Sequence, residues 1–334
     1  MKRLLSLILL LQVSLNCLSA SKTAIASGNW SIPSVWSPIG VPSNNDEVTI
    51  SAGKTITIDS LSGSCNSINI QSGAYLKVSA NSHFTISSTL GFTINGTFEV
   101  IGDVSIVNPN TSLKLNSGGK IIWSPLNNTE SNAQLFTQCD ESFNNESTIQ
   151  ISKWFNTNKG LGQYISGNFG NISINGIWNW DMGESLRDHP IEGKLSVINS
   201  YVILDSSNTN VTLNINQIEL QNSNSIIEIF KGASGTKNIN CNSITINGGQ
   251  LNLSSGNSSA NTKLKCLGDI AINSLGTLCG SYQNDANSEI EIQGNLNITK
   301  SLYYGVYQGA GNHKLKVDGN LTMLKGGTRF SELH

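Results

Sequence analysis

Charged residues are scarce in this sequence. Asp, Glu, Lys and Arg make up 13% of its 334 residues, about half the share that is usual in a soluble globular domain. No basic run follows Lys2 and Arg3, and acidic residues outnumber basic ones. The composition therefore excludes the electrostatic footprint of a protein that binds nucleic acid or an anionic lipid surface.

Several catalytic signatures are also missing. The sequence contains no Walker motif, no dinucleotide-binding glycine fingerprint, no His-Glu-x-x-His and no Gly-x-Ser-x-Gly. Nucleotide-dependent enzymes and zinc proteases therefore lose their usual support. Prolines are few, and no long amphipathic helix follows the N-terminus. The many β-branched residues and asparagines instead predict stacked strands and turns.

Cysteines do not follow the pattern of a disulfide framework, which normally has an even number at close spacing. Cys65 and Cys241 occur in the same phrase, Cys-Asn-Ser-Ile-x-Ile. Equivalent positions of a repeat usually point inward, where free Cys acts as a small apolar residue. We expect buried thiols, with a disulfide as the alternative. No metal-ligand spacing relates the other cysteines to one another or to the histidines: Cys139, Cys266, Cys279, His83, His189 and His313.

The first twenty residues predict a signal peptide. Lys2 and Arg3 precede the apolar run 4–11, and the small residues Ser19 and Ala20 end the segment. Because the apolar run is too short to span a bilayer, we expect cleavage after Ala20 and an exported protein without a transmembrane segment. A lipoprotein anchored through Cys17 is the alternative, although residues 14–16 form a poor lipobox.

One phrase recurs from residue 48 onward: alternating apolar and polar residues, a turn that often contains Gly, then a second alternating run. Successive phrases lie about twenty to twenty-five residues apart, which is typical of solenoid coils rather than hairpins. We therefore predict an all-β, right-handed parallel β-helix over residues 48–334, with identical residue types stacked in ladders. Tandem β-sandwich modules are the alternative. The rhythm weakens near 124–170, where we expect an irregular excursion. The last strand phrase lies shortly before residue 334, which is typical of truncation within a repeat, with a complete protein as the alternative.

Residues 21–47 differ from the repeats and predict a cap for the open end of the solenoid. They contain two tryptophans and three prolines, and the capping residues that we expect are Trp30, Trp36, Pro42 and Asp46. The phrases Gly40-Val41-Pro42, 46–50 and 53–59 that accompany the tryptophans resemble the opening of G8-type and related exported β-helix proteins. Such pectin-lyase-like solenoids are frequent in large secreted or surface proteins of the Bacteroidetes. The resemblance implies a secreted or cell-surface location.

The best candidate site is the segment 178–190, which concentrates aromatic and titratable side chains. Tryptophans can stack on sugar rings, two carboxylates could perform acid–base work on a glycosidic bond, and Arg or His could serve a lyase. The alternative is a solvated loop whose tryptophans pack on the solenoid edge. The candidate catalytic residues are Asp181, Glu184, Asp188 and His189, and the candidate ligand-binding residues are Trp178, Trp180 and Arg187.

A second acidic group contains Asp285, Glu289 and Glu291, whose oxygens could bind calcium. Their spacing matches no EF-hand, and alternation predicts instead that Glu289 and Glu291 face solvent on a strand. We therefore expect no cofactor, with calcium as the alternative.

Two functions fit these observations. The first is a non-catalytic secreted or outer-surface protein for adhesion, matrix or glycan contact, with a polysaccharide or cell-surface glycan as its partner. It follows from repetition without a convincing cluster of titratable residues. The second is a polysaccharide lyase or glycoside hydrolase on the same scaffold. That reading rests on analogy with pectin-lyase-like enzymes and with G8-bearing proteins linked to hyaluronan breakdown, and fold analogy is weak support for a function.

Overall fold

The structure is a computed structural model that describes residues 21–59, 62–126, 135, 139–153, 168–182, 186–232, 234–256, 259–273, 276–282, 286–299, 303–307, 311–324 and 329–330. The expected signal peptide, Glu184 and Asp285 lie outside the described residues, as does much of the expected excursion. Whereas the sequence predicted one continuous domain, the chain falls into two compact units. The first contains most residues up to 115, and the second contains most residues from 141 onward. Each unit is described by itself.

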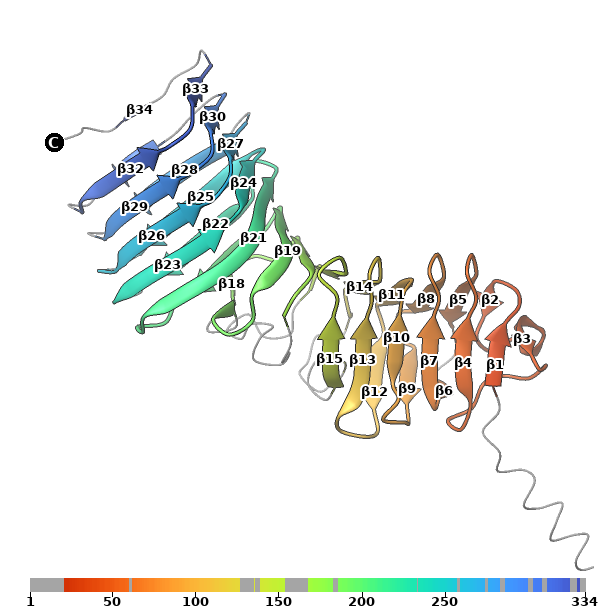
Figure 1. The fold of residues 1–334 in the computed structure, drawn as a ribbon. Coiled ribbons are helices and arrows are strands. Elements are labelled where there is room, and N and C mark those ends of the chain that lie inside the picture. The colour runs from red at the N-terminus through yellow and green to blue at the C-terminus, as the bar shows by residue number, and fades with distance from the viewer. Residues whose placement is uncertain are drawn as a thin grey trace, which may run out of the picture. The chain divides into compact units, whose positions relative to one another are not determined.

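The first unit is a parallel β-solenoid with three short strands in each coil (Figure 1). Tyr75 and Thr97, on successive coils, are direct register partners 22 residues apart, which confirms the predicted period. The first sheet contains β1 (Ser21–Ala24), β4 (Glu47–Ile50), β7 (Ser67–Ile70), β10 (Phe92–Ile94) and β13 (Thr111–Leu115); the second contains β2 (Gly28–Asn29), β5 (Thr55–Ile58), β8 (Tyr75–Val78) and β11 (Thr97–Val100); the third contains β6 (Ser62–Cys65), β9 (His83–Ile86) and β12 (Asp103–Ile106).

Alternating burial produces the core of this unit. In β5, Ile56 and Ile58 are fully buried, whereas the alternate residues Thr55 and Thr57 face outward. The turn before β5 needs Gly53, whose φ of 71° lies in the left-handed region. Its amide donates to the carbonyl of Gly73 at the equivalent turn of the next coil, with an N–O distance of 3.2 Å. The predicted pattern of strand, glycine turn and strand is therefore present.

The N-terminal end of the first unit is covered by residues 21–47. β1 adds a parallel strand to β4, and β3 (Trp36–Ser37) then pairs antiparallel with β1, after the 3-10 turn Pro33–Val35. Trp30 and Trp36 are buried with ring centroids 4.9 Å apart, and Trp30 contacts Phe84 at 5.4 Å. Because its indole fills the solenoid interior, Trp30 joins the end segment to the core.

Polar contacts hold the rest of this segment. The amide and hydroxyl of Ser43 both donate to the carboxylate of Asp46, at 2.7 and 2.9 Å, and Pro42 beside them is buried. The half-buried ammonium of Lys22 donates to the carbonyl of Pro38 at 3.0 Å. These bonds fix the loop that leads from β3 to β4.

The second unit continues the same architecture with longer strands. One sheet contains β14 (Lys120–Trp123), β16 (Thr148–Ile151), β17 (Asn171–Asn175), β19 (Ile191–Ile198), β21 (Val211–Gln221), β24 (Ser243–Ile246), β27 (Ile270–Ile272), β30 (Leu296–Ile298) and β33 (Leu321–Met323). A second contains β18 (Trp180–Asp181), β20 (Tyr201–Asp205), β22 (Ile226–Lys231), β25 (Gly249–Ser255), β28 (Gly276–Tyr282), β31 (Tyr303–Tyr307) and β34 (Arg329–Phe330). A third contains part of β21 with β23 (Thr236–Cys241), β26 (Asn261–Cys266), β29 (Asn287–Ile292) and β32 (His313–Val317).

The parallel pairing decides the fold class. Each of these strands pairs with the strand one coil away, whereas sandwich modules would join neighbouring strands in antiparallel hairpins. The protein is therefore an all-β, right-handed parallel β-helix, as predicted. Part of the expected excursion is also regular, because β16 pairs in parallel with β14 and β17. β15 (Cys139–Phe143) contains the boundary between the units.

Ladders of identical residues stack along the coils, as predicted from the asparagine content. Asn240 Nδ2 donates to Asn214 Oδ1 at 3.0 Å across a separation of 26 residues, and Asn273 Nδ2 donates to Asn247 Oδ1 at 2.9 Å. The expectation of buried thiols is likewise confirmed: Cys65, Cys139, Cys241, Cys266 and Cys279 are all free and buried.

Candidate functional site

The segment that begins at Trp178 presents one tryptophan and buries the other. Trp178 is 60% exposed, whereas Trp180 on β18 is fully buried. Asn179 between them has a φ of 59°, in the left-handed region, at the turn into β18. The expectation that both indoles face a ligand is therefore corrected, because the period-two alternation of β18 turns Trp180 into the core.

The described acidic and histidine side chains of this segment make no direct polar contact with one another. Among the described residues, no hydrogen bond or ion pair joins any two of Asp181, Asp188 and His189. The ring of His189 instead lies edge-on to the buried ring of Phe169, with centroids 6.4 Å apart. These three residues are therefore not joined directly to one another, and Glu184 lies outside the described residues.

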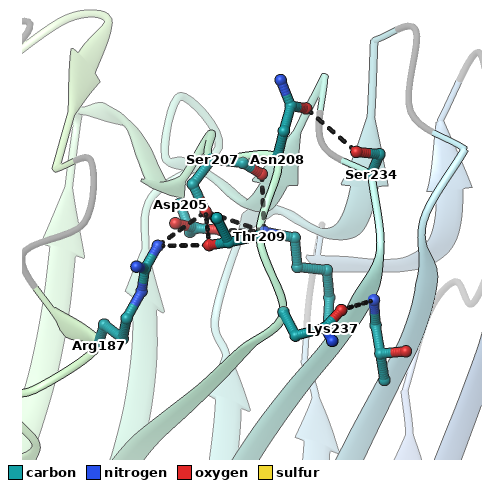
Figure 2. A network of polar contacts seen from close by, with 9 residues as sticks. Arg187, Asp205, Ser207, Asn208, Thr209, Ser234 and Lys237 are labelled. Carbon is teal, nitrogen blue, oxygen red and sulfur yellow. Dashed lines mark hydrogen bonds and ion pairs between the residues drawn. The ribbon is translucent and has the colours of Figure 1, made fainter.

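Arg187 is bound within a polar network of the second unit (Figure 2). Its Nη2 atom donates to Ser207 Oγ at 3.0 Å and to Thr209 Oγ1 at 2.8 Å. Both acceptors lie in the turn after β20. Arg187 therefore holds this turn, a structural role that the sequence reading did not foresee.

The centre of the same network is an ion pair between Lys237 and Asp205. The Nζ–Oδ2 distance is 2.6 Å, and both side chains are fully buried. Lys237 Nζ also donates to the carbonyl of Ser207 at 2.7 Å and to its hydroxyl at 3.0 Å (Figure 2). A buried charge of this kind needs its partner, because desolvation otherwise makes it very costly. The pair therefore ties β23 to the end of β20.

Sequence reasoning missed this pair, although one signal was present. In β23, Lys237 has the same parity as the buried Ile239 and Cys241, so the alternation turns its side chain inward. Its register partners on the adjacent coils are Val211 and Thr262. A lysine in the apolar phase of a strand is thus a usable signal of a buried charge. Its partner Asp205 cannot be chosen from the sequence alone.

A second arrangement surrounds the exposed indole, and we call it the Trp178 platform. It consists of Trp178, Tyr201, Glu228 and Lys231. The rings of Trp178 and Tyr201 meet edge to face, with centroids 5.7 Å apart. The Tyr201 hydroxyl donates to Glu228 Oε2 at 2.5 Å, and Lys231 Nζ lies 3.3 Å from the same oxygen and 4.8 Å from the Tyr201 ring centroid. Contacts to β22, on the coil after that of Tyr201, therefore hold the ring that supports Trp178.

The protonation states of the platform follow from these contacts. Burial, together with the hydrogen bond to Glu228, raises the pKa of Tyr201 above its ordinary value, although Lys231 opposes this. For Lys231, burial alone would lower the pKa, but the hydrogen bond to Tyr201 and the charge of Glu228 outweigh it and raise the pKa. At neutral pH the platform thus offers an indole, a neutral phenol and an ammonium group. Such a combination can stack on a sugar ring and bind its hydroxyls.

The acidic candidates Glu289 and Glu291 lie on β29 and face outward. Glu289 pairs with Lys314 at 3.1 Å, and Glu291 pairs with Lys263 at 3.1 Å and Lys316 at 3.4 Å. In the described part of the chain, no group of three or more His, Cys, Asp or Glu residues is placed to hold a metal ion. Asp285, the remaining member of the acidic group, lies outside the described residues.

Comparisons with known proteins give one match. Residues 22–180 match the family model described as a domain of unknown function, DUF8693. No curated protein and no solved structure matches the chain. No helix in the described ranges has the length and apolarity that a membrane span requires. The resemblance to G8-type proteins stays a prediction, and the matched family carries no stated function.

Proposed function

We propose that this is an exported, non-catalytic β-helix protein of the cell surface or matrix, and that it binds a glycan through the Trp178 platform. The observation that carries the proposal is the exposed indole of Trp178, supported edge-on by Tyr201. An exposed tryptophan on a rigid strand support is a typical contact for a sugar ring. Export follows from the signal peptide that the first twenty residues predict.

The support around Trp178 favours binding in a physical sense. The hydroxyl of Tyr201 is held by Glu228, and Lys231 lies over the Tyr201 ring. Side chains that are already ordered lose little conformational entropy when a ligand binds, so more of the contact energy appears as affinity. The Lys231 ammonium adds a hydrogen-bond donor for hydroxyl or carboxylate groups of the ligand.

The rival function is a polysaccharide lyase or a glycoside hydrolase on the same scaffold. Glycosidases need two carboxyl groups that flank the scissile bond at a defined separation. Among the described residues, Asp181, Asp188 and His189 make no contact with one another that would indicate such a site. Because the carboxyl groups of a glycosidase stand several ångströms apart, the assay for new chain ends decides between the two functions.

The experiment is a glycan panel with two readouts. The purified protein is incubated with pectin, alginate, hyaluronan, chondroitin and neutral polysaccharides, with and without calcium, and scored for bound protein and for new chain ends. We expect binding without cleavage, and roughly tenfold weaker binding after Trp178→Ala, because a ring-stacking contact is removed. Leu267→Ala is the control, since Leu267 is also exposed, at 50%, on the second unit but lies away from the platform.

Two outcomes would contradict the proposal. If Trp178→Ala and Leu267→Ala bind equally well, the platform is not the binding site. If new chain ends appear and are lost on Asp181→Ala or His189→Ala, the protein is an enzyme and its site includes the segment after Trp178.

A further inference from the structure

The outer surface of three adjacent strands in the second unit carries a regular array of charges. β26 contributes Lys263 and Lys265, β29 contributes Glu289 and Glu291, and β32 contributes Lys314 and Lys316. We call this surface the lysine face. It carries an excess of two positive charges, although acidic residues outnumber basic ones in the whole chain.

The register places these charges in two straight columns. Lys263, Glu289 and Lys314 are direct partners on successive coils, and Lys265, Glu291 and Lys316 form the second column. Because neighbouring strands lie about 4.8 Å apart, the two lysines of one column lie roughly 10 Å apart along the solenoid axis. The array is therefore a linear one, in which each column has an ammonium group on every second coil.

The lysines are available to an external anion. The side chains of Lys314 and Lys316 are 70% and 49% exposed, and their ion pairs with Glu289 and Glu291 measure 3.1 and 3.4 Å. Lys316 also pairs with Asp318, just after β32, at 3.1 Å, so Lys314 and Lys265 are the lysines with most unused charge. Exposed ion pairs of this kind contribute little, about 0–1 kcal/mol, so an incoming carboxylate can share or replace them. Within the described residues, Lys265 has no ion-pair partner. The face thus has cationic capacity that its own carboxylates do not use.

A groove of about 400 Å³ runs beside the first column. Its walls include Asn238, Asn261, Asn287 and Asn312, together with Lys263 and Lys314. Contacts between coils order these side chains. Asn287 Nδ2 donates to Asn261 Oδ1 at 2.8 Å, and the backbone N–H of Asn312 donates to Asn287 Oδ1 at 2.9 Å. The groove therefore offers fixed polar groups on each coil, between lysines that occur on every second coil.

We propose that the lysine face binds a linear acidic polysaccharide that lies along the solenoid axis, with carboxylate or sulfate groups on the lysines and hydroxyls in the asparagine groove. The spacing of roughly 10 Å between the lysines of one column favours a polymer whose negative charges lie at a similar interval. Double-stranded nucleic acid fits less well, because each of its strands carries one phosphate per about 3.4 Å of helix axis. This site is independent of the Trp178 platform, which contacts a sugar ring irrespective of charge.

The test compares variants with the same change of net charge. Binding of the purified protein to hyaluronan, polygalacturonate, neutral dextran and a single-stranded polynucleotide is measured at low and at high salt. The double variant Lys265→Gln/Lys314→Gln removes two charges from the lysine face, and Lys54→Gln/Lys114→Gln removes two from the first unit. Lys265→Arg/Lys314→Arg keeps the charge on the face.

We expect salt-sensitive binding of an acidic polysaccharide, weakened by about tenfold in the lysine-face double variant, because each lost contact removes a screened charge interaction. The control double variant and the arginine variant should stay within about twofold of the original protein. The proposal is overturned if no acidic polysaccharide binds, if both glutamine variants weaken binding equally, or if the polynucleotide alone binds. Because the two sites are independent, Trp178→Ala should weaken binding at the platform but leave the salt-sensitive binding of acidic polysaccharide at the lysine face unchanged.

Discussion

Lys237 and Asp205 form a buried ion pair across the interior of the second unit, with 2.6 Å between Nζ and Oδ2. The pair also orders the turn that Arg187 contacts, because Ser207 accepts from both cations. The charge at the inward phase of β23 is therefore paired inside the coil, and each member of the pair depends on the other.

Lys237→Met should destabilise the protein by about 3–5 kcal/mol, because it leaves the Asp205 carboxylate buried without a partner. The double variant Lys237→Met/Asp205→Leu should recover most of this loss, since both charges are then absent. The measurement is the free energy of unfolding from urea denaturation. Lys265→Met, on the outer surface of the neighbouring strand, is the control and should change stability by less than about 0.5 kcal/mol. Equal effects of Lys237→Met and Lys265→Met would show that the pair contributes nothing.

Truncation of Trp30 should lower the stability of the protein much more than truncation of Trp178. Trp30→Ala should cost about 3–5 kcal/mol, because it opens a cavity against Trp36 and Phe84 in the first unit. Trp178→Ala should leave stability nearly unchanged, since the indole is 60% exposed. Thermal unfolding of both variants checks this contrast. A stable Trp30→Ala protein would mean that the end segment is not anchored through its indole.

Two tyrosines should make stability depend on alkaline pH. Burial and a hydrogen bond to a carboxylate raise the pKa of Tyr75, which donates to Glu99 Oε2 at 2.7 Å, and of Tyr201, which donates to Glu228. A raised pKa in the folded state means that the stabilisation is complete below the unfolded value of about 10 and is lost as the pH rises towards the folded value.

The corresponding experiment measures the melting temperature from neutral to alkaline pH. The melting temperature of the original protein should fall above pH about 10, and Tyr75→Phe/Tyr201→Phe should fall less steeply, because phenylalanine has no proton to lose. Identical slopes for the two proteins would refute the role of the hydroxyls.

Much of the fold could be predicted because the relevant signals are local. Alternation in residues such as Thr55 to Ile58 sets which side chains face inward, and Gly53 supplies a turn conformation that other residues avoid. The distance between phrases exceeds that of a hairpin, which leaves a solenoid as the consistent arrangement. The asparagine content likewise predicted ladders, because equivalent positions stack in any parallel coil.

The site residues were harder to predict. Trp178 and Trp180 look equivalent in the sequence, yet the turn at Asn179 exposes one and the strand buries the other. The segment 178–190 was chosen for its density of titratable groups, but density along the chain says nothing about convergence in space. The groups that surround Trp178 come instead from later coils.

The amino-acid sequence alone determined the all-β class and the inward or outward phase of most strands, because these depend on neighbours two to five residues away. The distance between successive phrases predicted the parallel coils. The tertiary structure decided which residues of different coils meet: Lys237 with Asp205, Tyr201 with Glu228, and the lysines of β26 and β32 with the glutamates of β29. Coil lengths vary: register partners are 22 residues apart at Tyr75 and Thr97, and 26 residues apart at Asn214 and Asn240. The lateral register therefore depends on how each turn closes, and only the folded chain contains that information.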